Sequence, residues 1–416
     1  MPQAPHHADM TNRFPHAFRL LAGANLGAQS AEQLSLAAVP LVAVLALGSG
    51  AGEIGLLGAM QTLPFLLLSI PMGLLTDRLP RRQVMLASEA LRALSLLLLL
   101  GVVASGSVSV GALAVLGFIG ALGTVGFTIA APALVPALVP RELHARANGR
   151  LELARSAAYA GGPALAGALV AWTGAASAFV LATILSFAAV ALLWRVSEPP
   201  RAPAPARHAL VEIREGAQFV WHDALLRPIL LTGIAWNIAW FVLQAAYVPY
   251  AVRILGLSAQ AVGATMGCYG AGMVVGALLA PRVVGALRFG RAIQLGPAVS
   301  VLAIVAMVVT LVVPSGILAG LSFFLFGAGP IIWTITTTTL RQAITPSAML
   351  GRVGSVFLTV NAGARPVGAG IGAIVGGLWG EPACLWLALA GFVLQAMLIL
   401  ASSMNGLQRL PALRAG

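Results

Sequence analysis

Long apolar runs separated by short polar turns fill almost the whole chain. Each run is continuous and close to the roughly 20 residues that an α-helix needs to cross the hydrocarbon core of a bilayer, whereas strands of a membrane barrel would alternate apolar and polar side chains. Twelve such runs fall near residues 18–47, 53–76, 83–105, 110–132, 150–172, 175–194, 228–251, 259–280, 292–313, 317–338, 353–378 and 383–402. The pattern therefore predicts an all-α membrane protein with twelve transmembrane helices.

The pattern breaks once, in the proline-rich and charged stretch "SEPPRAPAPARHALVEIREGAQFVWHD" (197–223). This stretch predicts a linker followed by an amphipathic helix on the membrane surface. Six runs lie on each side of it, and the halves echo each other, since "AVPLV" around Pro40 recurs as "YVPYA" around Pro249. We expect a tail 1–17, a six-helix bundle 18–195, a linker 196–227, a second, pseudo-symmetric six-helix bundle 228–402 and a tail 403–416. Paired bundles of this kind suit alternating access, with the substrate held between them near the midplane.

Composition agrees with a membrane protein, because 59% of the residues are hydrophobic and only 9% are charged. The 24 basic residues are all arginines, and they are scattered between apolar runs, which argues against nucleic-acid binding. The two cysteines, Cys268 and Cys384, lie inside apolar runs and are expected to act as small hydrophobic residues. The six histidines lie outside the runs. We therefore expect no disulfide, no metal site and no cofactor.

The arginines also predict the orientation, because positive charge on short loops faces the cytoplasm. With the N-terminus inside, Arg253 is the arginine on an outer loop, Arg92, Arg155 and Arg365 lie within runs, and the others fall on the inner side. The first 17 residues lack the pattern of a cleaved secretion signal. We expect a multi-pass protein of the cytoplasmic (inner) membrane with both termini in the cytoplasm.

The turn "GLLTDRLPRR" (73–82) concentrates charge between two apolar runs. Its arginines are expected to hold the topology by attraction to anionic lipid. Asp77 is hypothesised to pair with a basic group or helix terminus of the opposite half and so to close an inner gate. An ordinary solvated loop charge is the alternative.

Three motifs carry a resemblance to a known family. The turn resembles the loop motif of the major facilitator superfamily through Gly73, Asp77, Arg78, Arg81 and Arg82. The stretch "GRLELARSAAYAGGPALAG" (149–167) is similar to the antiporter motif of drug–proton exchangers through Gly149, Gly162, Pro163 and Gly167. Together with "LVPRELHARANG" (138–149), the whole chain resembles the branch that contains the enterobactin exporter and macrolide efflux proteins. The resemblance implies a secondary transporter and does not name a substrate.

Polar residues inside the runs mark the candidate cavity. An ionisable group at mid-span costs roughly 2.5–3.5 kcal/mol on insertion scales, so it usually faces a polar interior. Glu32 lies midway along the first run with no basic residue near it in sequence. Two polar stripes share helical faces, namely Asn25, Gln29 and Glu32 on the first run and Asn237, Trp240, Gln244 and Tyr247 on the seventh. We expect both stripes to line a cavity in which protonation of Glu32 competes with substrate; permanent hydrogen bonding of Glu32 for packing is the alternative.

The runs contain other charged residues with possible structural or functional roles. Glu89 with Arg92, and Glu152 with Arg155, are spaced for neutralisation within one helix, which favours packing or gating at the inner end. Arg365, one turn after Asn361, has no acid near it in sequence. It is expected either to hold an anionic group of the substrate or to be the counter-ion of Glu32 or Asp77 from the other half.

The sequence thus favours a secondary active exporter of a small amphipathic or drug-like molecule in exchange for protons. A nutrient importer or facilitator with the same fold is the alternative. An enzyme is not expected, since we find no catalytic cluster, and the chain has no phosphate-binding glycine loop with lysine. The expected partners are a small-molecule substrate, protons and the lipid bilayer, with no nucleic acid, and the expected state is a monomer.

Overall fold

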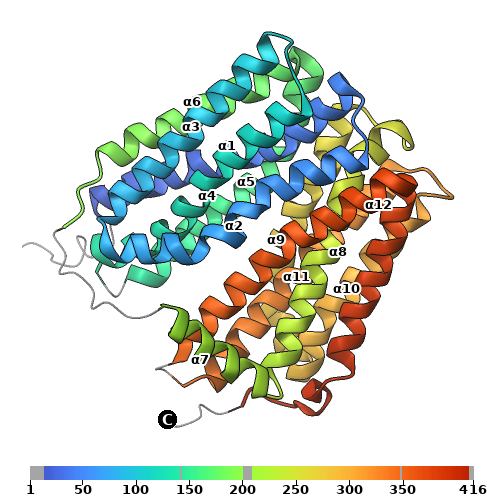
Figure 1. The fold of residues 1–416 in the computed structure, drawn as a ribbon. Helices are drawn as coiled ribbons and strands as arrows, with labels where there is room; N and C mark the ends of the chain where they lie inside the picture. The colour runs from blue at the N-terminus through green and yellow to red at the C-terminus, as the bar shows by residue number, and fades with distance from the viewer. Residues whose placement is uncertain (1–13, 141–142, 200–208, 347–348, 412–416) are drawn as a thin grey trace, which may run out of the picture.

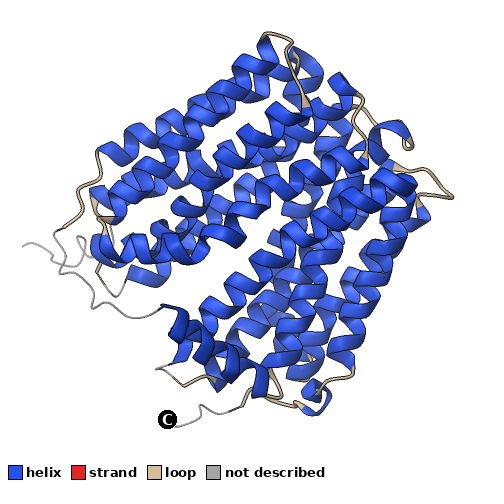
Figure 2. Ribbon diagram, in the orientation of Figure 1, coloured by secondary structure: helices blue, strands red, loops and turns tan. Residues whose placement is uncertain are grey.

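The computed structural model describes residues 14–140, 143–199, 209–346 and 349–411, and these residues form helices joined by short turns (Figure 2). The helices are α1 (His16–Leu47), α2 (Ala51–Arg78), α3 (Arg81–Ala104), α4 (Val110–Leu138), α5 (His144–Thr173), α6 (Ala175–Trp194), α7 (Ala209–His222), α8 (Leu226–Arg253), α9 (Ala259–Ala286), α10 (Phe289–Val309), α11 (Gly316–Ile344) and α12 (Leu350–Leu400). A short 3-10 turn, Ser403–Gly406, follows α12.

The predicted fold class is confirmed. Ten of the described helices are long and apolar enough to cross a membrane. One of the ten, α12, consists of two arms, because Gly380 interrupts it with a φ of 78° that favours glycine. Figure 1 shows the two arms meeting at a sharp bend and diverging from it. α5 (30 residues) is not among the ten, because it is less apolar, but it packs along α1. With α5 and the two arms of α12, α1–α6 and α8–α12 give twelve long helical arms in the described chain.

The arms lie in two groups, with α1–α6 on one side and α8–α12 on the other (Figure 1). Within the first group α1 packs on α5 and α6, and α3 packs on α4 and α6; within the second α8 packs on α12, and α9 packs on α11. The expected amphipathic helix is α7, which lies across one end of the second group and packs on α12. We call this end of the molecule, which also holds the start of α1, the α7 end, and the opposite end the far end.

Large apolar side chains also cover the outside of both groups. Leu278 and Leu378 are each 67% exposed, and Ile317 is 85% exposed. Such a surface is unfavourable in water, whereas in a bilayer it faces acyl chains as apolar as itself. Polar backbone groups are satisfied within the helices, as the hydrocarbon core requires.

Three helices begin at the far end with the same local device. Ser109, Ser258 and Ser315 precede α4, α9 and α11, and each hydroxyl accepts a hydrogen bond from the N–H group three residues later. Serine is favoured at this position because it satisfies a donor that the helix itself leaves free. The turns at this end are therefore set by local sequence.

Small residues let the two groups approach closely along two seams. The first seam joins α5 to α9, where a Cβ atom added to Gly263 would lie 2.9 Å from the Cα atom of Gly167. The second joins α2 to α12, where a Cβ atom added to Gly52 would lie 3.1 Å from the Cα atom of Gly377. Helices in a bilayer pack most closely where such residues meet. From these seams the two groups diverge toward the α7 end (Figure 1).

At the far end a single arginine connects the two groups. The guanidinium of Arg253, at the end of α8, donates to the carbonyl oxygen of Gly48, in the turn between α1 and α2. The same guanidinium lies 3.3 Å from the carboxylate of Glu381, at the bend of α12. We call these three residues the far-end contact; it holds the two groups together where the polypeptide turns.

At the α7 end the charged turn is tied to its own group of helices. The backbone N–H groups of Arg81 and Arg82 donate to the carboxylate of Glu198, at 3.1 and 2.8 Å. The Arg82 guanidinium donates to the carbonyl oxygens of Leu193 and Trp194, at the end of α6. Asp77 lies in α2, but its side chain is outside the described part of the structure, so its pairing across the two groups stays a hypothesis.

Candidate functional site

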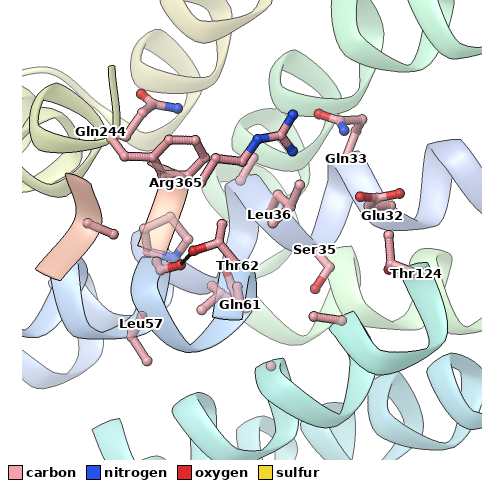
Figure 3. Close-up of a pocket in the computed structure, with 18 of the residues that line it drawn as sticks. Glu32, Gln33, Ser35, Leu36, Leu57, Gln61, Thr62, Thr124, Gln244 and Arg365 are labelled. Carbon is pink, nitrogen blue, oxygen red and sulfur yellow. Dashed lines mark hydrogen bonds between the residues drawn. The ribbon is translucent and has the colours of Figure 1, made fainter. Parts of the chain in front are cut away.

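A cavity of about 320 Å³ lies between the two groups of helices. Helices α1–α5 line one side of it, and α8, α9, α11 and α12 line the other. Figure 3 shows that Glu32 and Gln33 from α1, Thr124 from α4 and Arg365 from α12 point into this space. A cavity bounded by both groups is where alternating access places a substrate.

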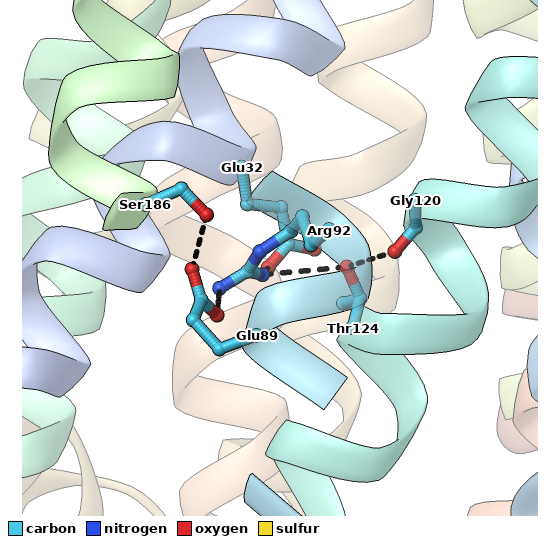
Figure 4. A network of polar contacts seen from close by, with 6 residues as sticks. All are labelled: Glu32, Glu89, Arg92, Gly120, Thr124 and Ser186. Atoms are coloured by element: carbon cyan, nitrogen blue, oxygen red, sulfur yellow. Dashed lines mark hydrogen bonds and ion pairs between the residues drawn. The ribbon is translucent and has the colours of Figure 1, made fainter. Parts of the chain in front are cut away.

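The most heavily charged part of the cavity wall is a three-residue network that the sequence did not predict as a unit. Arg92 on α3 forms an ion pair with Glu89 one helical turn earlier, and its other nitrogen lies 3.5 Å from the carboxylate of Glu32 on α1. Thr124 on α4 accepts a hydrogen bond from Arg92 at 3.3 Å, and Ser186 on α6 donates to Glu89 at 2.5 Å. Figure 4 shows the guanidinium between the two carboxylates. We call Glu32, Glu89 and Arg92 the triad.

The two carboxylates of the triad have different surroundings. The side chain of Glu89 is fully buried, whereas that of Glu32 is 18% exposed and lines the cavity. Taking a charged group out of water is costly unless it is paired and hydrogen-bonded, and Glu89 has both an ion pair with Arg92 and a hydrogen bond from Ser186. Glu32 is thus the acid of the triad that a ligand or a proton can reach.

Arg365 lies on the opposite wall and, unlike Arg92, has no ion-pair partner among the described residues. Its Nε atom is buried without a hydrogen-bond partner, and no acid among the described residues lies within ion-pair distance of its guanidinium. Its guanidinium carbon lies 5.7 Å from the centre of the Phe65 ring of α2. The structure therefore pairs Glu32 with Arg92 of its own group of helices and leaves Arg365 available for another partner.

Gln33 presents a second unsatisfied donor beside Arg365. Its side chain is 5% exposed, it lines the cavity, and its Nε2 atom has no hydrogen-bond partner among the described residues. In Figure 3 the Arg365 guanidinium points toward Gln33. Buried polar atoms are usually hydrogen-bonded, so two neighbouring orphan donors mark a place for an acceptor from outside the protein.

Aromatic rings supply the apolar part of the wall. Trp236 and Trp240 of α8 stack with their ring centres 5.4 Å apart and an angle of 13° between planes. Tyr269 of α9 lies 5.2 Å from Trp240, and Phe323 of α11 meets the same indole edge-on at 5.8 Å. All four residues line the cavity. Such a wall can bury the flat apolar body of a ligand.

The two predicted polar stripes are divided between the cavity and the protein interior. Glu32, Asn237, Trp240 and Gln244 line the cavity. Asn25 instead donates to the carbonyl oxygen of Leu151 at 3.2 Å, so it packs α1 against α5.

Three further candidates also lie apart from the cavity wall. Gln29 is buried outside it, and the hydroxyl of Tyr247 is hydrogen-bonded to Thr265. Asn361 accepts a hydrogen bond at 3.3 Å from Asn237, which lines the cavity, and so holds the Asn237 side chain in place.

Most of the remaining candidates have partners within the helices. Glu152 and Arg155 pair with each other on α5, as their spacing predicts, at 2.5 Å, and both are partly exposed. In the antiporter-like motif, Pro163 lines the cavity, Gly167 meets α9 in the first seam, and Gly162 lies against Gln33. Gly149 and, in the charged turn, Gly73 have open space beside them.

Several cavity or network residues were not predicted from the sequence, among them Gln33, Gln61, Thr124 and Ser186. Each is a polar residue within an apolar run, so composition offered a signal. Nothing in one helix, however, indicates which neighbouring helix supplies the partner of such a residue.

Comparison with known proteins agrees with this architecture. The family model described as "Major Facilitator Superfamily" matches residues 21–369. The chain is 28% identical over 264 residues to a protein named enterobactin exporter EntS from Citrobacter koseri, a match that covers 63% of this chain and 60% of that relative. The chain thus spans about three fifths of the length of this curated relative.

Two solved structures share the fold. A bacterial homologue of the iron transporter ferroportin in its inward-facing state superposes with a TM-score of 0.73 at 18% identity, covering 92% of this chain and 98% of that one. A structure of such a homologue in its outward-facing state gives a TM-score of 0.63 at 18% identity, covering 94% and 100%. At this identity the likeness concerns the fold alone.

Proposed function

The chain belongs to the Major Facilitator Superfamily, and we propose that within this family it is a secondary active exporter that exchanges protons for a small amphipathic or drug-like molecule. The observation that carries the proposal is the asymmetry of the triad. One carboxyl group, that of Glu89, is fully buried and paired with Arg92, whereas the other, that of Glu32, lies near the same arginine and lines the cavity.

In the proposed cycle the substrate enters the cavity from the α7 end, which the arginine distribution assigns to the cytoplasm. The two seams and the far-end contact close the opposite side in this conformation. Reversal would require the halves to part at the seams and to meet at the α7 end. Rocking of two rigid bundles about a central site is the motion that this architecture allows.

Proton exchange would operate through the charge of Glu32. When Glu32 is ionised, the triad carries two negative charges and one positive charge, so a donor or cationic group of the substrate is attracted to this wall. When Glu32 takes up a proton, Arg92 and Glu89 neutralise each other and that attraction is lost. A proton entering down a potential of 100 mV supplies about 2.3 kcal/mol for the exchange.

Outward direction rests on two supports. The curated relative reported above is named as an exporter, and the motif "GGPALAG" on α5 resembles that of antiporters. We place the protein in the cytoplasmic membrane of its cell, as a monomer with both termini inside, because the arginines gather on the loops of that side.

The test uses inverted membrane vesicles, in which the cytoplasmic end faces the medium. Acidifying the lumen should drive uptake of fluorescent amphipathic dyes, and Glu32→Gln should abolish this gradient-driven uptake while inserting normally. Glu152→Gln is the matched control, because Glu152 pairs with Arg155 and lies outside the cavity wall. Equal uptake by Glu32→Gln would refute proton coupling through this residue. Accumulation of the dyes inside intact cells would instead support the importer.

A further inference from the structure

The two walls of the cavity carry opposite charge. On the first wall the triad has two carboxyl groups and one guanidinium, so one negative charge is left over when both acids are ionised. On the second wall Arg365 carries a positive charge that has no acidic partner among the described residues. Because the interior has a low dielectric constant, each charge attracts a ligand group of opposite sign strongly. Arg365 also acts electrostatically on Glu32, without forming an ion pair with it.

The unsatisfied donors on the second wall indicate which ligand group could bind there. Arg365 Nε and Gln33 Nε2 are both buried, and neither has an acceptor among the described residues. Arginine presents several N–H groups in one plane and matches a carboxylate with two parallel hydrogen bonds, while the glutamine amide can supply one more. A planar anionic group, such as a carboxylate, satisfies this pair.

The space between the charged walls is aromatic. Trp236, Trp240 and Tyr269 present a set of ring faces and edges on the side of α8 and α9. A flat ring system gains from both burial and stacking there.

We infer that the substrate class is an aromatic zwitterion, with its anionic group on Arg365 and Gln33, its cationic group on Glu32, and its ring system against Trp236 and Trp240. This assignment rests on the proposed function for the location of the site. It adds that the protein binds the anionic and the cationic group of the ligand separately. It also gives the two halves a ligand that bridges them, since Glu32 and Arg365 belong to opposite groups of helices.

Equilibrium binding to the purified full chain in nanodiscs tests this assignment near neutral pH. The probes are norfloxacin, which carries a carboxylate and an ammonium group on an aromatic body, its methyl ester, which keeps the cation alone, and its N-acetyl derivative, which keeps the anion alone. Charged hydrogen bonds of this kind correspond to roughly tenfold or more in affinity, so wild type should prefer norfloxacin over each derivative by about that factor.

Two variants separate the two ends of the ligand. Arg365→Gln should remove the preference of norfloxacin over its methyl ester and keep the preference over the N-acetyl derivative. Glu32→Gln should do the reverse. Arg352→Gln is the matched control on the same helix, because Arg352 pairs with Glu215 of α7 at 2.5 Å and lies outside the cavity. It should keep both preferences.

The assignment is overturned if wild type binds the methyl ester as tightly as norfloxacin, if Arg365→Gln weakens all three probes equally, or if none of the probes binds. Binding needs no gradient, so the result is independent of proton exchange and direction. Zwitterion preference without gradient-driven uptake would refute the proposed function alone, and gradient-driven uptake of cations without this preference would refute the substrate class alone.

Discussion

Glu32 on α1 lies 3.5 Å from Arg92 on α3, and the same arginine is already paired with Glu89. One cation therefore serves two acids that differ in access to the cavity. This relationship explains how a chain that is only 9% charged can keep an acid in its centre that is both held in place and reachable.

Arg92→Gln should destabilise the protein strongly. It leaves Glu89, which is fully buried, with Ser186 as its hydrogen-bond donor and no cation, and breaking a buried pair costs roughly 3–5 kcal/mol. We expect a large fall in the thermal unfolding temperature of the protein in detergent. Adding Glu89→Gln should restore much of the loss, since the uncompensated charge disappears; failure of this rescue would contradict the pairing.

Arg155→Gln is the control for that experiment. Its partner Glu152 is 53% exposed, and exposed ion pairs contribute about 0–1 kcal/mol. The unfolding temperature should change little. A loss as large as that of Arg92→Gln would show that exposure does not separate the two pairs.

Gly263→Leu should hold the two groups of helices apart at the first seam. The new side chain would begin 2.9 Å from the Cα atom of Gly167, which is backbone and cannot rotate away. We expect a shift toward conformations open at the far end, measured as faster labelling of Gln244→Cys by a membrane-impermeant maleimide added on that side. All labelled variants would also carry Cys268→Ser and Cys384→Ser, so that position 244 holds the cysteine that reacts.

Gly285→Leu provides the matched control on the same helix. Among the described residues, no atom outside its own stretch of helix lies within 4 Å of the place where its Cβ atom would be. Labelling at position 244 should stay at the parent rate, and equal acceleration by both variants would argue against a steric effect at the seam.

Arg253→Gln should weaken the far-end contact. The variant loses the cation that joins the carbonyl oxygen of Gly48 to the carboxylate of Glu381. The same maleimide assay at position 244 should show faster labelling, and a charge-conserving Arg253→Lys should recover part of the parent rate. Unchanged labelling in Arg253→Gln would mean that the seams close this end without the contact.

Asn25→Ala and Gln244→Ala should separate packing from ligand contact. Asn25 makes a buried hydrogen bond to Leu151, and its loss should lower the free energy of unfolding by about 1 kcal/mol. Binding of norfloxacin should be unchanged in that variant. Gln244 lines the cavity, so its truncation should weaken binding with little change in stability; the opposite pattern would place the cavity elsewhere.

The twelve spans, the fold class and the break near residue 200 could be predicted from the sequence because they depend on local properties. A helix that crosses the bilayer needs a certain length and hydropathy. A segment rich in proline and charge lacks both, whatever sequence follows it. Loop arginines predict the orientation for the same reason, since their cost of translocation does not depend on which helices are neighbours. Glu89 with Arg92 was also within reach, because one helical turn brings the two side chains together.

The triad and the charge of the opposite wall depend on the tertiary structure. Periodicity places Asn25 and Glu32 on one face of α1, but α1 is packed on several sides, so a polar face can meet either a cavity or another helix. Here Asn25 meets α5 and Glu32 meets the cavity. Only the arrangement of the helices brings Glu32 of α1 to Arg92 of α3 and, within the described residues, leaves Arg365 of α12 with no acid at ion-pair distance. The sequence supplies the charges, and the distances between helices determine which of them remain free for a ligand.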